Sequence, residues 1–132
     1  MNARQFHPDG SAPADDHCFV FGSNLSGIHG AGAAKAAHAL YGAKWGFAEG
    51  WFGRSYAIPT VQEHIAGPLS LVEIRAAVNR FKCFAERHSK MRFFVTRVGC
   101  VLAGHADSEI APMFADVPLN CSLPDKWQRF FA

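Results

Sequence analysis

The sequence predicts an α/β fold, a single three-layer domain in which helices flank a mostly parallel sheet. Short apolar runs that end at glycine or proline are typical of buried strands. Along this chain they alternate with segments of helical periodicity, as in βαβ units. The chain has 132 residues, of which 49% are hydrophobic and 18% charged. This is the size of one domain, with enough apolar material for a core.

The first predicted strand, residues 17–22, is an unbroken apolar run stopped by glycine. The alanine-rich segment 31–41 follows it and is expected to form a helix that ends at Gly42. Residues 55–58 form the second predicted strand, closed by Pro59. Residues 71–88 show the clearest amphipathic helical spacing, and Ser70 with Glu73 forms a capping-box pattern at its start.

The C-terminal half contributes one well-defined strand and two shorter elements. Residues 92–98 form that strand, and a glycine-bounded loop, 99–104, follows it. Asp107 is expected to cap a short helix, 108–114, with Glu109 in the first turn, where the helix dipole favours an acid. A short strand near 119–122 precedes an aromatic end. Residues 1–16 are polar and contain no predicted element, so the domain is expected to span residues 17–132.

Composition and charge exclude several classes of protein. The net charge of +2 gives no sign of the basic face of a nucleic-acid binder, so no nucleic-acid partner is expected. No apolar run reaches the roughly 18 residues of a membrane span, and the polar N-terminus lacks the pattern of a signal peptide. These features predict a cytoplasmic protein with no membrane partner. The histidines show no metal-ligand spacing, and the four scattered cysteines are expected to be free thiols, so neither metal nor cofactor is expected.

The most informative segment is residues 21–35, FGSNLSGIHGAGAAK. It joins the end of a hydrophobic strand to the start of a helix through a glycine-rich loop, whose backbone can approach a ligand closely. The free amides and the dipole of the helix N-terminus favour an anion, so phosphate or pyrophosphate is the expected occupant. The expected ligand-binding residues of this loop are Gly22, Ser23, Asn24, Gly27, Gly30, Ala31, Gly32 and Lys35.

A second glycine-bounded loop follows the predicted strand 92–98, and open α/β sheets bind ligands beyond the carboxyl ends of their strands. Its expected ligand-binding residues are Gly99, Cys100, Ala103 and Gly104. Neither loop matches a common phosphate-binding motif, because the Gly-Lys-Ser/Thr unit of the P-loop is absent and Lys35 replaces the third small residue of the dinucleotide fingerprint. A purely structural interpretation, in which the glycines only permit tight packing, stays open.

In these residues the sequence resembles the macro-domain family of ADP-ribose binders and hydrolases. In that family a strand ends at an asparagine, followed by a short glycine-rich loop and a small-residue helix. FGSNLSGIHGAGAAKAA looks like a variant of this element, with Asn24 matching the family's asparagine. A second family element, a strand leading to a glycine-rich phosphate loop, resembles FVTRVGCVLAG, residues 94–104. The match covers roughly residues 17 to 115, with Asp15 or Asp16 as the available counterpart of the family's adenine-binding aspartate.

The resemblance implies a macro-domain-like sheet that binds ADP-ribose or a related nucleotide, and it implies hydrolysis of an ADP-ribosyl linkage as an activity. In such a reaction Asn24 would orient the distal ribose, and a side chain or a ligand phosphate would activate the attacking water. His29 is the first candidate for that side chain.

Two alternatives stay open. One is a non-catalytic reader or sequestering protein for a nucleotide signal, built on the same pocket. The other is a protein-interaction module whose exposed aromatic tail, residues 127–131, docks a partner or forms a homo-oligomer with a second copy.

Further hypotheses concern single side chains. Trp51 and Phe52 lie in a glycine-bounded loop and could stack on an adenine ring, whereas Phe47 and Tyr56 are expected in the core. Cys100 would be a nucleophile only with a basic partner such as His105 or His29.

Overall fold

The computed structural model describes residues 4–14, 16–63, 67–101 and 103–131. Its centre is a six-stranded sheet with the strand order β1-β6-β5-β2-β4-β3. Neighbouring strands are parallel except for the antiparallel pair β3–β4. The strands are β1 (Phe6–His7), β2 (His17–Asn24), β3 (Gly50–Phe52), β4 (Ser55–Val61), β5 (Arg92–Val95) and β6 (Cys121–Pro124). The helical elements are α1 (Gly32–Leu40), α2 (Leu71–Arg87), α3 (Asp107–Ile110), η1 (Ala111–Phe114) and η2 (Asp125–Phe130).

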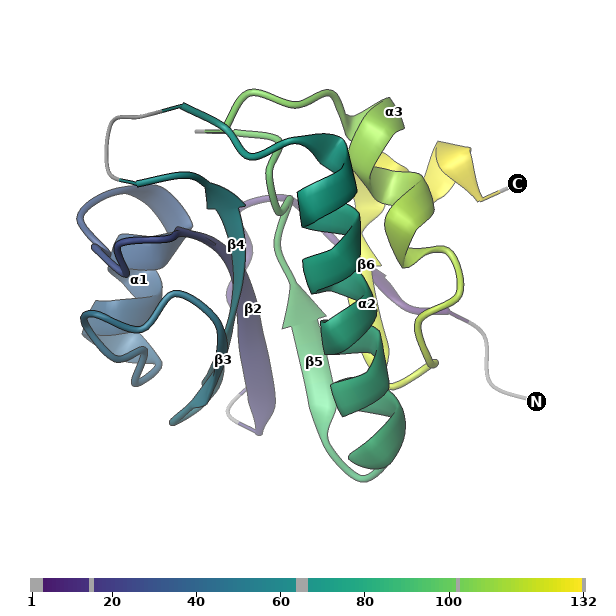
Figure 1. Cartoon of the computed structure of the whole chain (residues 1–132). Helices are drawn as coiled ribbons and strands as arrows, with labels where there is room; N and C mark the ends of the chain where they lie inside the picture. Colours follow the sequence, from purple (N-terminus) through teal and green to yellow (C-terminus); the bar gives the residue numbers. More distant parts are fainter. Residues whose placement is uncertain (1–3, 15, 64–66, 102, 132) are drawn as a thin grey trace.

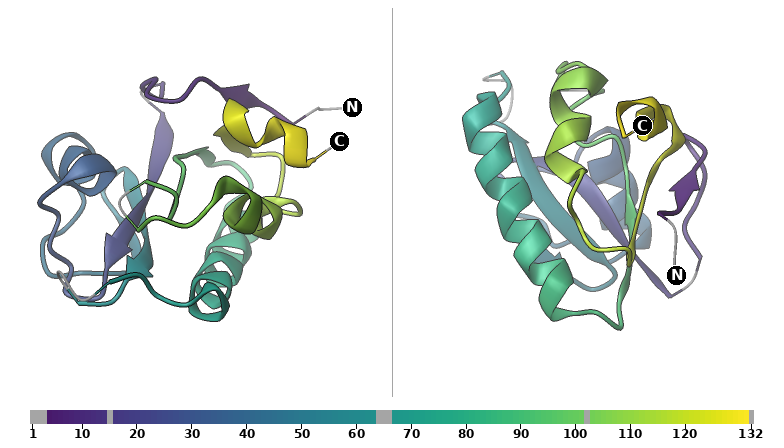
Figure 2. Two further views of the ribbon diagram at one scale, coloured as in Figure 1. Left: turned by 90° about the horizontal axis from the view of Figure 1, so that it is seen from above. Right: turned by 90° about the vertical axis from the view of Figure 1, so that its right-hand side faces the viewer.

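The helices cover both faces of the sheet, which confirms the predicted three-layer α/β class (Figures 1 and 2). Alternation along β2 separates two cores, since successive side chains of a strand point to opposite faces. Phe19 and Phe21 pack against the alanines of α1, whose small side chains allow a close approach. Cys18 and Val20 pack on the other face, in the larger core formed with α2, η1 and η2.

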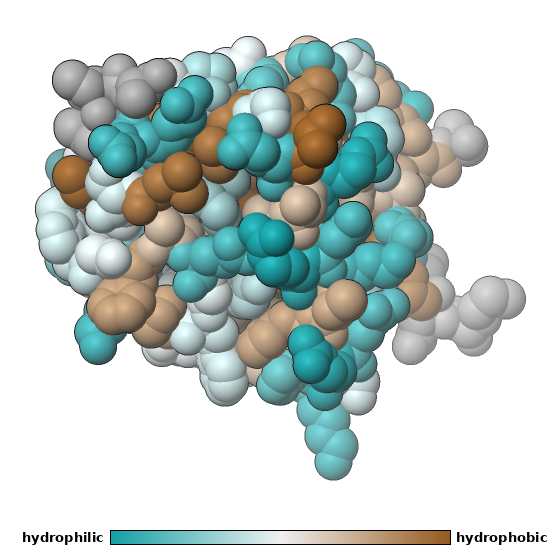
Figure 3. Space-filling view, viewed as in Figure 1, coloured by the Kyte–Doolittle hydropathy of each residue, from teal (hydrophilic) through white to brown (hydrophobic). Residues whose placement is uncertain are grey.

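Helix α2 forms where the amphipathic spacing predicts it. Ser70 Oγ accepts a hydrogen bond from Glu73 N at 3.2 Å, and the Glu73 carboxylate accepts one from Ser70 N at 3.3 Å, so the capping box is confirmed. Its apolar stripe is buried at Ile74, Ala77, Val78, Phe81 and Ala85. Figure 3 shows that the opposite side of the helix presents mainly hydrophilic residues.

All four predicted strands end elsewhere than expected: β2 continues past Gly22 to Asn24, β6 continues past Ser122 to Pro124, and the ends of β4 and β5 also differ. Strand β4 continues through Pro59 to Val61. Phe19 N of β2 donates to Arg54 O, so every second residue counted from Arg54 directs its backbone groups toward β2. Pro59 is not in that series and directs its backbone toward the β3 side, where the pairing with β3 stops at Ala57. The amide that proline lacks therefore has no strand partner to lose. Strand β5 ends at Val95, three residues early, because the chain turns there and Val98 N bonds to Thr96 O at 2.7 Å.

The structure also corrects the role predicted for Asp107. The N-cap of α3 is Ala106, whose amide donates to the Glu109 carboxylate at 3.0 Å. The Asp107 carboxylate instead accepts hydrogen bonds from Arg97 and Trp127. Asp107 therefore makes a tertiary contact instead of capping the helix.

The segment before residue 17 adds a strand that no sequence pattern predicts. Phe6 lies opposite Leu123 and His7 opposite Pro124, so β1 pairs in parallel with β6 at the end of the sheet. A strand of two residues is too short to show a hydrophobic period. Strand β6 itself begins at Cys121, two residues later than expected.

The aromatic C-terminal end packs inward, so the predicted exposed tail is wrong. Trp127 is fully buried, stacks at a tilt on Phe114 with ring centres 5.1 Å apart, and donates its indole N–H to Asp107. Phe130 and Phe131 are partly buried against the same core. In the described part of the chain, no helix combines the length and the hydrophobicity that crossing a membrane requires.

Candidate ligand-binding site

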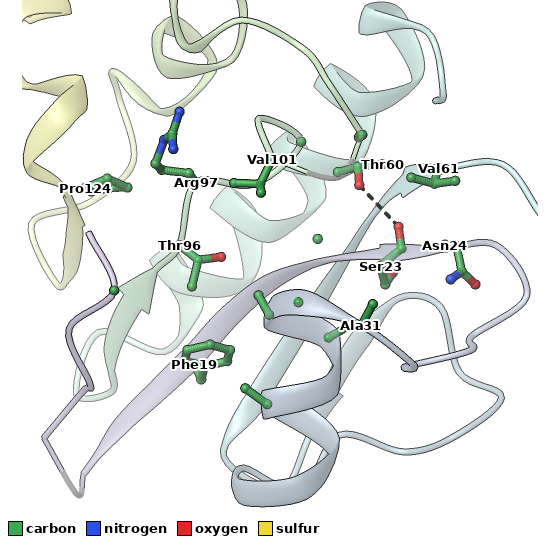
Figure 4. A pocket seen from close by; sticks show the side chains of 18 of the residues that line it. Phe19, Ser23, Asn24, Ala31, Thr60, Val61, Thr96, Arg97, Val101 and Pro124 are labelled. Carbon is green, nitrogen blue, oxygen red and sulfur yellow. Dashed lines mark hydrogen bonds between the residues drawn. The ribbon is translucent and has the colours of Figure 1, made fainter. Parts of the chain in front are cut away.

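A cavity of about 840 Å³ lies at the carboxyl edge of the sheet, beside the N-terminus of α1 (Figure 4). Its volume falls within the roughly 300–1,000 Å³ of small-molecule sites. Strand β2 leads to α1 on one face of the sheet, and the adjacent strand β5 leads to α3 on the other. Ligands of open α/β sheets bind where neighbouring connections separate in this way, because a crevice opens between them.

The first wall of the cavity is the loop between β2 and α1. Gly30, Ala31, Gly32, Ala33 and Ala34 line it. The N-cap residue of α1, Ala31, makes no side-chain cap, and the first turn contains no acid. The amides of the first turn have no acceptor within the helix, so they are available to an anion in the cavity. Gly32 has φ +57, a conformation that other residues rarely adopt.

The second wall is the loop after β5. Gly99, with φ +77, Val101 and Ala103 line the cavity. The loop is closed by hydrogen bonds from Cys100 N to Arg97 O and from His105 N to Gly99 O. Figure 4 shows Val101 and Ala31 on opposite sides of the cavity, so backbone-rich segments border it on two sides.

Gly22 allows the strand ends beneath these loops to approach one another. A Cβ atom at this position would lie 3.1 Å from Thr60 Oγ1 and 3.4 Å from Gly99 N. Ordinary Cβ contacts are longer than the first of these distances, so a larger residue would push β4 away from the floor of the cavity.

One end of the cavity is polar and is formed by the ends of β2 and β4. Asn24 Nδ2 donates to Ile28 O at 2.8 Å, and Ile28 N donates to Asn24 Oδ1 at 3.1 Å. These bonds close the loop, and the second N–H of the Asn24 amide remains for another acceptor. Thr60 Oγ1 donates to Ser23 O at 3.3 Å, while the Ser23 hydroxyl donates to Ala48 O.

The other end is aromatic. Phe19 and Tyr41 stack with ring centres 4.5 Å apart, and His7 stacks on Phe94 at 3.8 Å. All four rings line the cavity. Burial lowers the pKa of His7, and its Nδ1 lies 2.7 Å from Ser122 Oγ.

A charged cluster borders this aromatic end. Arg97 donates from Nε to Asp107 Oδ1 at 3.0 Å and from Nη2 to Oδ2 at 2.6 Å. The hydrogen bond from Arg97 lowers the pKa of Asp107 to about 2, with a further contribution from the Trp127 indole. Asp9 Oδ2 lies 3.6 Å from Arg97 Nη1 and 3.4 Å from Lys126 Nζ. Arg97 and Asp9 both line the cavity.

Eight of the residues predicted from the sequence to form the site are brought together around this cavity. They are Gly22, Ser23, Asn24, Gly30, Ala31, Gly32, Gly99 and Ala103. The cavity lining does not include the other five, Gly27, His29, Lys35, Cys100 and Gly104.

His29 lies behind the cavity wall rather than in it. Its side chain is 2% exposed, its Nε2 lies 2.9 Å from Lys44 O, and its ring packs edge-on against Phe21 and Trp45. Gly27, with φ +67, packs against the backbone of Gly46 and Phe47. Both residues support the shape of the loop.

Cys100 lacks the character of a nucleophile. Burial and the neighbouring Asp107 carboxylate raise the pKa of its thiol to about 12. His105, one of the basic partners considered for it, has its Nε2 3.0 Å from Leu69 O.

The aromatic residues of the segment 47–52 lie away from the cavity. Trp51 packs against Phe84 and His88 on the α2 side, and Phe52 packs against Phe47. They do not form the predicted stacking wall, and Phe47 is 44% exposed rather than in the core. Tyr56 is buried as expected.

The aromatic end was missed by the sequence reasoning. His7 and Asp9 belong to the polar segment before the first predicted strand, where no pattern marks them. Phe19 and Phe94 are strand residues that read as ordinary core, and only the direction of α1 decides that they border a cavity.

The chain matches no protein-family model, and no curated protein sequence matches it. Within the described ranges, no group of three or more His, Cys, Asp or Glu side chains is placed to hold a metal ion.

Proposed function

We propose that the cavity binds ADP-ribose or a closely related nucleotide diphosphodiester. One observation carries this proposal: the cavity is aromatic at one end, bordered by free helix amides and a second glycine loop in the middle, and polar at the other end. The order matches a ligand built as base, diphosphate and distal ribose. The resemblance of residues 21–37 and 94–104 to the macro-domain family implies the same ligand class.

The middle of the cavity suits a diphosphate. The amides of Gly32 and Ala33 at the start of α1 point one positive helix end into it, and the loop at Gly99 lies across from them. Among the described residues that line the cavity, Arg97 is the one with a permanently charged cationic side chain, and Asp107 and Asp9 offset its charge. These uncharged amides balance the smaller negative charge of a diphosphodiester better than the larger negative charge of a triphosphate.

The aromatic end suits the base. His7 and Tyr41 offer ring surface, each stacked on a buried phenylalanine, and Asp9 offers a hydrogen-bond acceptor in the same cavity lining. In this proposal Asp9, rather than Asp15 or Asp16, takes the place of the aspartate that the resemblance implies for adenine. Asp16 is exposed and pairs with His17, and Asp15 lies outside the described residues.

The polar end suits the distal ribose, with the remaining N–H of Asn24 and the hydroxyl of Thr60 as hydrogen-bonding groups. Of the described residues that line the cavity, those with titratable side chains are His7, Asp9, Tyr41 and Arg97, and they gather at the base end. This distribution favours binding without catalysis. Hydrolysis of an ADP-ribosyl linkage is the second candidate function, and it would depend on a ligand phosphate to activate the water.

The test is a thermal-shift panel with ADP-ribose, NAD, ADP, AMP and ATP. A ligand that binds only the folded state stabilises it by about 2.7 kcal/mol at a hundredfold excess over Kd. We expect the largest rise in Tm with ADP-ribose and a smaller one with ATP. No shift with any of the five would overturn the proposal. Release of ADP-ribose from an ADP-ribosylated peptide then separates a hydrolase from a reader.

A further inference from the structure

We infer that residues 4–12 form a strap that closes the aromatic end of the cavity from outside, opens while the rest of the domain stays folded, and is held closed by a bound nucleotide. The coupling to nucleotide rests on the proposed function, whereas the opening of the strap does not. The strap thus regulates the same site, because a ligand that contacts the strap binds only as tightly as closure allows.

The strap forms one wall of the cavity. The strap residues that line the cavity are His7, Asp9, Gly10, Ser11 and Ala12. The ring of His7 stacks on that of Phe94 at 3.8 Å, and Phe94 is 6% exposed with this cover in place. Opening of the strap therefore uncovers a buried ring at the aromatic end and joins the cavity to solvent.

The strap adds no fully buried side chain to either core. All of its residues are partly buried or exposed, whereas those of β2 and β4 are mostly buried. Its most apolar side chain, Phe6, is only partly buried, with its ring centre 6.1 Å from that of Phe131. Strand β1 spans two residues and pairs with β6 at the end of the sheet, beside η2 (Figure 2). Segments with so little buried apolar surface open at a lower free energy than the core.

The contacts that fasten the strap are mainly polar. At its start, the Arg4 guanidinium donates to Pro118 O at 2.7 Å and to two further carbonyls. Further along, Asp9 Oδ2 lies 3.6 Å from Arg97 Nη1 and 3.4 Å from Lys126 Nζ. Water replaces these partners when the strap opens, so each contact adds little net stability to the closed form.

The chain has a fixed point just beyond the strap. Ala14 O accepts hydrogen bonds from His17 N at 3.0 Å and from Arg54 Nη2 at 3.2 Å. Ala14 is therefore held by the first residue of β2 and by the turn between β3 and β4. The strap can swing about this point while the pairing of the central strands stays intact.

His7 makes closure depend on pH. Burial in the closed strap lowers the pKa of His7 below its ordinary value of 6.5. A backbone hydrogen bond at Val95 and the charges of Asp125 and Asp9 favour the protonated ring, and His17 opposes it, but burial has the largest effect. The open strap therefore binds a proton more readily than the closed strap. Closure is favoured fully above pH 6.5 and weakens as the pH falls below that value.

A ligand in the cavity contacts the strap wall only when the strap is closed. Its binding therefore shifts the strap toward the closed form, since a ligand favours the state to which it binds more tightly. The apparent Kd equals the intrinsic Kd divided by the closed fraction of the chain. Conditions that open the strap should weaken nucleotide binding without any change in the glycine-rich loops.

Amide hydrogen exchange of the ¹⁵N-labelled chain measures the opening, as protection factors that are corrected for the intrinsic exchange rate. Leu123 N donates to Gln5 O at 3.0 Å, so its amide is released when the strap opens. Phe93 N donates to Asn120 O at 2.8 Å, just before β6, and is the control for fraying of β6 itself. At pH 7 without nucleotide, we expect the protection of Leu123 to be lower than that of Phe93 by about tenfold or more. Equal protection of the two amides would overturn the strap.

Two variants test what fastens the strap. Arg4→Gln should lower the protection of Leu123 by about tenfold, the size of one charge-assisted hydrogen bond, and no change would contradict the fastening role of Arg4. Arg75→Gln is the matched control, since it removes an exposed arginine of α2 and should leave that protection unchanged. His7→Phe keeps a ring on Phe94 without a titratable group. Between pH 7 and 5.5 the protection of Leu123 should fall severalfold in the wild type and less in His7→Phe, and an equal fall would overturn the role of His7.

Addition of ADP-ribose tests the coupling. At a tenfold excess over Kd, a ligand that binds only the closed form should raise the protection of Leu123 by about tenfold. Unchanged protection of Leu123 in a chain that binds ADP-ribose would overturn the coupling, because the ligand would then bind the open and closed forms equally. If the chain binds no nucleotide, the proposed function fails and the coupling fails with it, while exchange without nucleotide still decides whether the strap opens.

Discussion

The guanidinium of Arg97 and the carboxylate of Asp107 form a two-bond ion pair that joins the loop after β5 to the first turn of α3. Because Trp127 donates to the same carboxylate, this pair also ties the C-terminal η2 to the wall of the cavity. The shape of the aromatic end therefore depends on a contact that lies outside it.

Asp107→Asn should lower the free energy of unfolding at neutral pH by about 1–3 kcal/mol, because Arg97 is left with a weaker acceptor. The pKa of Asp107 is about 2 in the folded chain and 3.8 when unperturbed. Its contribution is therefore fully present above pH 3.8 and is lost as pH falls through 3.8 toward 2.

Urea titrations at about pH 5, 4, 3 and 2 measure this effect. The difference between wild type and Asp107→Asn should shrink across that window. Asp16→Asn is the control, since Asp16 is 76% exposed on its side chain and should show almost no difference. A difference that stays constant from pH 5 to 2 would show that the ion pair does not govern the pKa.

Gly30 offers a change that tests the diphosphate position without straining the fold. A Cβ atom there would have one neighbour within 4 Å, Ile28 Cγ2 at 3.9 Å. Gly30→Asp adds a negative charge beside the amides of α1 and should weaken ADP-ribose binding by tenfold or more, roughly the 1.4 kcal/mol of one strong charge contact.

Gly30→Asn has the same size without the charge, and calorimetry on the pair isolates electrostatics from bulk. The Gly30→Asn variant should lose far less affinity for ADP-ribose than the Gly30→Asp variant. Equal losses in the two variants would mean that no phosphate lies at this loop.

Gly27→Ala should be strongly destabilising, by about 3 kcal/mol or more. The φ of +67 disfavours any side chain, and the new Cβ would lie 2.5 Å from Phe47 N, where neither backbone can move aside cheaply. Gly46→Ala separates the cost of the positive φ from the cost of the steric clash. Gly46 has φ +88 with no atom within 4 Å, so it should cost only about 1–2 kcal/mol, as denaturant unfolding can measure.

Trp127→Ala should cost about 3–5 kcal/mol of stability, since a fully buried ring is removed. Trp127→Phe should cost less, because it mainly removes the hydrogen bond to Asp107. Unfolding and gel filtration of both variants distinguish a core role from a docking role. Unchanged stability together with a loss of assembly would restore the interaction-module alternative.

Local signals in the sequence were enough to predict the elements that depend on them. The capping box at Ser70 and Glu73, the glycine after α1 and the apolar runs of β2 and β5 all act within a few residues, and each is found near its predicted place. The glycine-rich loop was also correctly placed at the carboxyl edge of the sheet, since strand direction follows from the βαβ pattern.

The features that could not be predicted depend on contacts between residues that are distant in the chain. Asp107 reads as a helix cap until Arg97 and Trp127 are brought beside it, and no local pattern reveals that competition. His29 reads as a loop residue facing a ligand, yet the fold turns it toward Phe21. The aromatic end of the cavity combines β1 with β5 and β2, and pairings of this range leave no period in the sequence.

The most direct test of the central claim is a ¹⁵N–¹H correlation spectrum of the labelled chain titrated with ADP-ribose, because it locates the ligand as well as detecting it. We expect saturable shifts of the Gly30, Gly32 and Gly99 amides, together with the amides of Asp9 and Ser11 at the aromatic end. Amides outside the cavity, such as those of Gly46 and Trp51, should stay in place. Shifts confined to that second group, or no saturable shift at millimolar nucleotide, would contradict the claim that this cavity is a nucleotide site.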